Sequence, residues 1–108
     1  MTLDVFRPTP PTMSTISVSL HDVQVGNALT AEVAHETESC PVSTLGDTNC
    51  NIYQRGATEK ASHILGFPFV TRWHATAVRS GQVTVFATAH GSPRMRLLVE
   101  ERFPEMKC

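Results

Sequence analysis

Histidine and cysteine are the residue types in this chain best suited to chemistry, and the chain has five histidines and three cysteines. Two of the histidines, His74 and His90, lie in residues 70–90, where apolar and polar residues alternate. If this segment forms two paired strands, both imidazoles share one face but lie about 13 Å apart along it. Two ligands of one zinc ion each lie about 2.0–2.1 Å from the metal. The spacing therefore argues against a His–His metal site or catalytic pair.

The cysteines offer no metal site either. His35, Cys40 and Cys50 are three candidate ligands, but their spacing matches no zinc motif and a fourth ligand is missing. The number of cysteines is odd and no two of them form a C-x-x-C pair, so we expect reduced thiols in a cytoplasmic protein without cofactors. A bridge between Cys40 and Cys50, with Cys108 left over, remains the alternative.

No catalytic motif accompanies these residues. The chain has no G-x-S-x-G, no phosphate-binding G-x-x-x-x-G-K-[ST] and no H-E-x-x-H sequence. His35 and His63 could each act as a general base, since histidine titrates near neutral pH. Both are expected to be structural instead, so the sequence favours a protein that is not an enzyme.

Length and charge exclude further classes of function. A chain of 108 residues fits one domain. Its net charge of -1 makes nucleic acid an unlikely partner. No apolar run approaches the ~18 residues that cross a bilayer, so no membrane contact is expected, and the N-terminus does not look like a secretory signal.

The elements that must position these side chains begin after residues 1–14, which are predicted to be a flexible, proline-rich leader. Pro8 and Pro11 in it match the PxxP spacing. Residues 15–108 are predicted to form a single α+β domain. Its first part is expected to be a hairpin of residues 16–25 and 29–34, with a bulge at His21–Asp22 where the alternation changes phase. A helix over residues 28–36, capped by Asn27, stays open as the alternative.

A short helix over residues 57–66 is predicted next, because Ala61, Ile64 and Leu65 form an apolar stripe and Gly66 suits its C-terminus. Residues 69–79, 82–90 and 94–101 then predict a three-stranded antiparallel meander. A three-residue loop at 79–81, with Gly81 left-handed, places the apolar residues of the first two strands opposite each other. A helix over residues 94–102 stays open as the alternative.

The two faces of this meander suggest binding surfaces. One face carries Trp73, Val85, Leu97 and Val99 and is expected to be covered by the helix and the first hairpin. The other face has an apolar band, expected to contact a second copy or a protein partner. That band consists of Phe86, Leu98, His74 and Val70. At one end of the same face a cationic cluster could hold an anion: Arg72, Arg94, Arg96 and His90.

The order hairpin, helix, antiparallel strands resembles a shortened hot-dog fold. That resemblance implies a dimeric acyl-thioester enzyme with an acid near its central helix, for which Asp47 or Glu59 would be the candidate and His63 an auxiliary base. Three classes of function therefore remain. The leading hypothesis is a small non-catalytic binding protein, an adaptor or inhibitor that forms a homodimer through a sheet face. The others are a hot-dog-like enzyme and an anion or nucleic-acid contact through the arginines.

Overall fold

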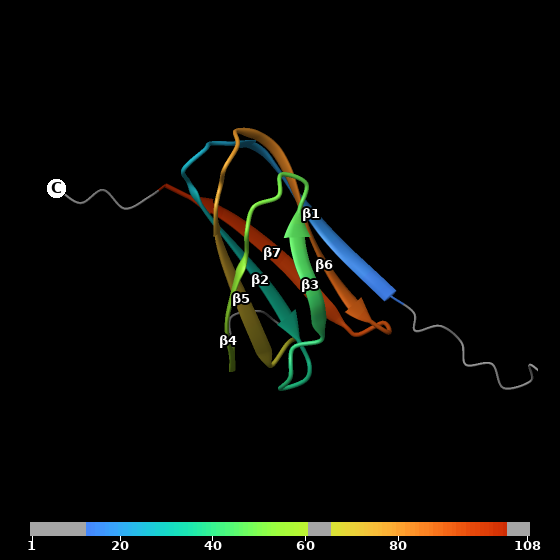
Figure 1. Ribbon diagram of the computed structural model, residues 1–108. Helices are drawn as coiled ribbons and strands as arrows, with labels where there is room; N and C mark the ends of the chain where they lie inside the picture. The colour runs from blue at the N-terminus through green and yellow to red at the C-terminus, as the bar shows by residue number, and fades with distance from the viewer. Residues whose placement is uncertain (1–12, 61–65, 104–108) are drawn as a thin grey trace, which may run out of the picture.

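The computed structural model describes residues 13–60 and 66–103, and within them every regular element is a β-strand (Figure 1). The described part contains no helix that could cross a bilayer. The strands, in chain order, are β1 (Met13–Val23), β2 (Ala28–His35), β3 (Val42–Asp47), β4 (Gln54–Lys60), β5 (Phe69–Thr76), β6 (Gly81–His90) and β7 (Met95–Arg102).

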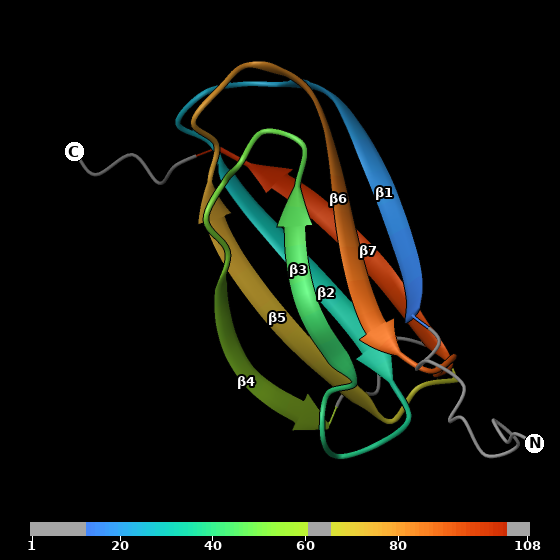
Figure 2. The same cartoon turned by 45° about the vertical axis from the view of Figure 1, so that its right-hand side comes forward.

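These strands form two antiparallel sheets that pack face to face as a sandwich (Figure 2). The first sheet has the order β1-β6-β3 and the second the order β4-β5-β2-β7. The α+β class predicted from the sequence is therefore wrong: the described residues are all-β.

The alternation of apolar and polar residues explains which side chains fill the space between the sheets. In a strand, successive side chains point to opposite faces, so every second residue points inward. Trp73, Val85 and Leu97 are buried, with Trp73 only 5 % exposed, and Val99 packs half-buried against the same core. The prediction that these four residues point inward is thus confirmed, but they do not share one sheet face. Val85 lies in the β1-β6-β3 sheet and the other three lie in the facing sheet, to whose inner face β2 adds Leu29, Ala31 and Val33.

The predicted helix over residues 57–66 is wrong for the part that the structure describes. Residues 57–60 belong to β4, which pairs with β5; residues 61–65, including His63, lie outside the described residues. Local helix propensity in a short segment is worth only tenths of a kcal/mol per residue, and the backbone hydrogen bonds offered by the edge of β5 override it.

The predicted hairpin and meander are also wrong, although their strands exist. β1 pairs with β6 and not with β2, while β5 pairs with β2 and β4 and not with β6. The connections at 24–27, 77–80 and 91–94 therefore cross from one sheet to the other. The apolar residues of two successive strands point toward the core whether the strands form a hairpin or lie in different sheets. The alternation of apolar and polar residues therefore fits both arrangements and does not tell them apart.

Two local predictions near these connections are confirmed. The register of β1 shifts between Leu20 and Val23, and Asp22 has a positive φ of 58°, as a bulge at His21–Asp22 requires. Gly81 has a φ of 115°, a conformation that favours glycine, although it begins β6 rather than closing a hairpin. Of the predicted leader, residues 1–12 lie outside the described residues, and residues 13 and 14 begin β1.

Candidate functional site

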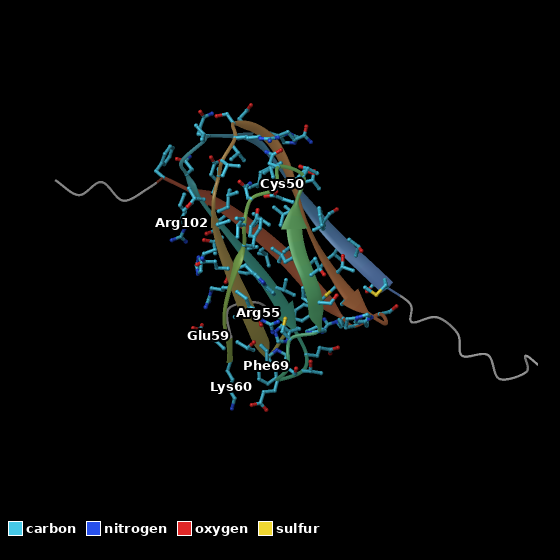
Figure 3. The ribbon with its side chains drawn as sticks, viewed as in Figure 1. Cys50, Arg55, Glu59, Lys60, Phe69 and Arg102 are labelled. Atoms are coloured by element: carbon cyan, nitrogen blue, oxygen red, sulfur yellow. The ribbon has the colours of Figure 1, made fainter. Side chains whose placement is uncertain are left out.

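Three chain connections and the end of β7 meet at one end of the sandwich, which we call the loop end. The connections are residues 24–27, 48–53 and 77–80 (Figure 2). Phe103, which follows β7, lines a hollow together with Gln24 and Asn27 of the first connection. In Figure 3 the labels of Cys50 and Arg102 lie toward this end, and those of Lys60 and Phe69 lie toward the opposite end. Loops that a rigid sandwich holds in place are common sites of binding.

The loop end is unusually apolar on its surface. Among the described residues, five large hydrophobic side chains are exposed, and four of them lie here. Ile52 and Phe103 are 80 % and 82 % exposed, and Val25 and Val78 are 59 % and 57 % exposed. Because exposing apolar surface costs free energy, such a gathering on one surface marks a contact site more often than single exposed residues do.

A buried carboxylate shapes the connection that carries Ile52. Asp47, at the end of β3, accepts hydrogen bonds from the backbone N–H of Asn49 (2.9 Å) and of Asn51 (3.1 Å). It also accepts from the side-chain amide of Asn51 (2.7 Å) and from the hydroxyl of Tyr53 (2.6 Å). The side-chain oxygen of Asn51 in turn accepts from the backbone N–H of Val78 at 2.9 Å, which fixes Ile52 and Val78 on neighbouring loops.

Further hydrogen bonds join the remaining parts of the loop end. The backbone N–H of Gly26 donates to the carbonyl of Ala77 (2.8 Å), and the N–H of Ala77 donates to the carbonyl of Asn27 (2.9 Å). Glu101 on β7 accepts from the backbone N–H of Gln24 and from the side chain of Asn27, each at 2.8 Å. The apolar side chains are therefore carried by a surface that is already ordered before any partner binds, which lowers the entropic cost of binding.

Two hollows border this surface. One lies beside Ile52 and Val78 and has His74 on its wall. The other lies beside Phe103, where Asp22 and Glu101 add carboxylates. A protein segment bound across the loop end would contact the apolar hollow on one side and the acidic hollow on the other.

The predicted apolar band does not form. Phe86 lies on the outer side of the β1-β6-β3 sheet over Gly46, whereas Leu98 and Val70 lie on the outer side of the other sheet. Val70 is fully buried in a small cluster with Ala34, against which Leu98 packs. Of the four predicted interface residues, only His74 borders the loop end.

The predicted cationic cluster is also divided. Arg72 bonds to Glu32 at 2.8 Å and to Glu59, and these bonds raise its pKa further above the usual value. Arg94 donates to the carbonyl of Gly66 (2.8 Å) and lies over the ring of Phe67. The remaining two residues are Arg96, on β7 in the sheet of Arg72, and His90, at the end of β6 in the other sheet.

The candidate acids and bases have structural partners. The four hydrogen bonds to Asp47 occupy both of its carboxylate oxygens, and Glu59 binds Arg72. His35 is fully buried; its Nδ1 donates to the carbonyl of Thr37 (2.7 Å), so its Nε2 accepts from the hydroxyl of Thr71 (2.8 Å). Burial lowers the pKa of His35, the bond to Thr37 opposes this, and the charge of Arg55 adds to the lowering.

Neither a metal site nor a disulfide is found in the part of the chain that the structure describes. No three His, Cys, Asp or Glu side chains gather there closely enough to hold an ion. Cys40 and Cys50 are free and flank β3 at its two ends. A strand of this length spans about 20 Å, far beyond the ~7 Å that a bridge allows between Cα atoms, so the Cys40–Cys50 alternative is wrong.

The four exposed hydrophobic residues were missed by reasoning from the sequence. Val25 falls within the strand predicted over residues 16–25 and Val78 within the strand predicted over residues 69–79, and no prediction from the sequence includes Ile52 or Phe103. Their sequence signal is weak but real, because each lies near the end of a predicted strand or outside the predicted elements, where an apolar side chain is not needed for the core.

Comparison with family models, with curated proteins and with solved structures finds no match for this chain.

Proposed function

We propose that this protein is a small non-catalytic binding protein, of adaptor or inhibitor type, that acts as a homodimer and holds an apolar segment of a protein partner at its loop end. One observation carries the proposal: Val25, Ile52 and Val78 are exposed at one end of the sandwich on loops that hydrogen bonds hold in place, and the exposed Phe103 follows β7 at the same end. Interfaces take most of their affinity from a few such apolar side chains in an ordered setting.

The chemistry of the titratable groups also favours binding over catalysis. Both carboxylate oxygens of Asp47 and both ring nitrogens of His35 are hydrogen-bonded within the fold, and Glu59 is paired with Arg72, so these groups have structural partners rather than a substrate-facing position. We place the protein in the cytoplasm as part of the same proposal, because the free thiols of Cys40 and Cys50 suit a reducing compartment.

The loop end can be tested without a known partner by selecting binders from a random linear peptide library displayed on phage, with the full chain as the target. We expect peptides rich in apolar and aromatic residues, whose binding perturbs the backbone NMR signals of residues 24–27, 48–53, 77–80 and 103. Ile52→Ser and Val78→Ser should each weaken a selected peptide about tenfold or more, the effect of losing one apolar contact of about 1.4 kcal/mol.

The matched control is Thr44→Ser, an exposed residue on β3 away from the loop end. It should leave peptide binding unchanged. No enrichment of peptides, or binding that perturbs a sheet face and ignores Ile52→Ser and Val78→Ser, contradicts the proposal.

A further inference from the structure

β1 forms an edge of its sheet that lacks the features by which proteins usually keep an edge strand from pairing. The strand order of the sheet is β1-β6-β3, so within the described residues one side of β1 has no hydrogen-bonded strand (Figure 2). β7 of the facing sheet packs close to β1 but does not pair with it. From Met13 to Leu20 it pairs with β6 in an unbroken register, and it contains neither a charged residue nor a proline there. Long, regular, uncharged edges of this kind are sites where another strand adds to a sheet.

The other three edges are protected. β4 carries Arg55, Glu59 and Lys60 and has a register shift between Arg55 and Thr58. β3 is short, and its register shifts between Val42 and Thr44. The last edge, β7, is rich in charge, with Arg96, Glu100, Glu101 and Arg102. The contrast singles out β1 as the edge open to pairing.

The sequence of β1 fits a second copy of itself. A two-fold axis perpendicular to the sheet keeps the outer faces of both copies on the same side, so outward residues must lie opposite outward residues. With the axis at Ser17, Ser17 lies opposite its own copy, Thr15 lies opposite Ser19, and Ile16 lies opposite Val18. Over residues 15–19, hydroxyls thus meet hydroxyls on the outer face and aliphatic side chains meet on the inner face, with no charge on either copy. Beyond this stretch Leu20 lies opposite Ser14.

The partial burial of the inward side chains of β1 also supports a second copy of β1 as the pairing strand. Ile16, Val18 and Leu20 pack against the core but are only half-buried, because β1 is the last strand of its sheet. A second β1 beside them would cover their exposed sides and would occupy the backbone N–H and C=O groups of the free edge, both of which stabilise the pair.

We propose that two copies of the chain pair antiparallel along β1, about a two-fold axis at Ser17, so that their three-stranded sheets join into one continuous sheet. This inference rests on the homodimer of the proposed function and names its interface. Because the two β1 strands run in opposite directions, the two loop ends lie at opposite ends of the dimer.

The test uses charge at the position that meets its own copy. The side chain of Ser17 is exposed in the single chain, so Ser17→Lys and Ser17→Glu should both fold, as circular dichroism and the fluorescence of Trp73, the only tryptophan, will show. In sedimentation velocity, the unmodified full chain should change from monomer to dimer as its concentration is raised from about 1 µM to about 500 µM. This range covers the dissociation constants expected for weak contacts between edge strands. Each variant alone should remain a monomer, since like charges directly opposite each other repel.

An equimolar mixture of Ser17→Lys and Ser17→Glu should restore the dimer, because the charges then attract. The matched control, Thr44→Lys, places the same charge on the other edge strand of this sheet and should dimerise like the unmodified chain. A dimer that persists in both Ser17 variants, or one that Thr44→Lys also abolishes, overturns the β1 interface but leaves the homodimer. A chain that stays monomeric throughout overturns both, and the peptide test of the loop end still decides the binding function.

Discussion

At the scale of single residues, the polar groups in the interior of this protein build structure. The clearest case is the chain of hydrogen bonds that runs from the hydroxyl of Thr58 to that of Thr71 (2.7 Å), then to His35 Nε2 and from His35 Nδ1 to the carbonyl of Thr37. Since the carbonyl of Thr37 can only accept, His35 Nδ1 must be the donor to it. His35 Nε2 then accepts from the hydroxyl of Thr71, and the hydroxyl of Thr71 accepts from that of Thr58. His35 thus fastens the end of β2 to β5 and to the following loop, and its imidazole has no free nitrogen for a substrate.

Tyr53 gives a prediction at this scale, because it is the only tyrosine in the chain and lies against a buried carboxylate. Burial raises the pKa of Tyr53 far above its usual value near 10, and the hydrogen bond to Asp47 raises it further. The unfolded chain loses this proton above pH 10 and the folded chain keeps it. The contribution of Tyr53 to the free energy of unfolding is therefore fully present below pH 10, and the free energy of unfolding should fall as the pH rises beyond it.

Titration of the tyrosinate absorbance will check this. In urea the absorbance should appear near pH 10; in the folded protein it should appear only together with the change in Trp73 fluorescence that reports unfolding. Tyrosinate that forms near pH 10 while the fold is intact contradicts the role assigned to Asp47.

At the scale of elements, the sequence predicted strand faces well and strand partners poorly. The inward residues of β5, β6 and β7 are those expected from alternation, which depends only on backbone geometry within one strand. Which strand lies beside which depends on how each connection turns, and residues 77–80 or 91–94 could close a hairpin as readily as cross between sheets. Among neighbours in the chain, only β4 and β5 pair within the described residues.

The bulge in β4 supports a prediction about this element. A Cβ added at Gly56 would lie 3.1 Å from the carbonyl oxygen of Arg72, so a side chain there requires the backbone of β4 or β5 to move by a few tenths of an ångström. Gly56→Val should therefore lower the free energy of unfolding by about 1–3 kcal/mol, as expected for overpacking, even though valine favours strands. The neighbouring change Ala57→Val, at an exposed position, should cost far less. Equal urea midpoints for the two variants would show that the close approach does not matter.

At the scale of the whole molecule, the position of the loop ends decides what a dimer can do. Two copies paired along β1 present their apolar loop ends in opposite directions, so one dimer can bridge two partners but cannot place both loop ends on one flat surface. The loop end of the second copy is joined to that of the first only while the two copies remain paired.

A bridging measurement follows. A peptide selected by the loop end is immobilised, the protein is captured on it, and a labelled copy of the same peptide is then added in solution. The unmodified chain should retain about one labelled peptide per dimer, that is, one for every two captured chains, and the monomeric Ser17→Lys variant should retain almost none. Equal retention by both would mean that the loop ends do not lie at opposite ends of a β1 dimer.

The sequence by itself determined the strand segments of residues 69–102, the bulge at His21–Asp22, and the inward direction of Trp73, Val85 and Leu97, because each follows from local backbone geometry and from excluding apolar side chains from water. Only the tertiary structure decided that residues 57–60 form a strand, that Phe86 and Leu98 lie on opposite outer faces, and that Val25, Ile52, Val78 and Phe103 gather at one end. Those facts depend on which sheet each strand joins. Such pairing is set by contacts between segments far apart in the chain, and a periodic pattern within one segment contains no information about them.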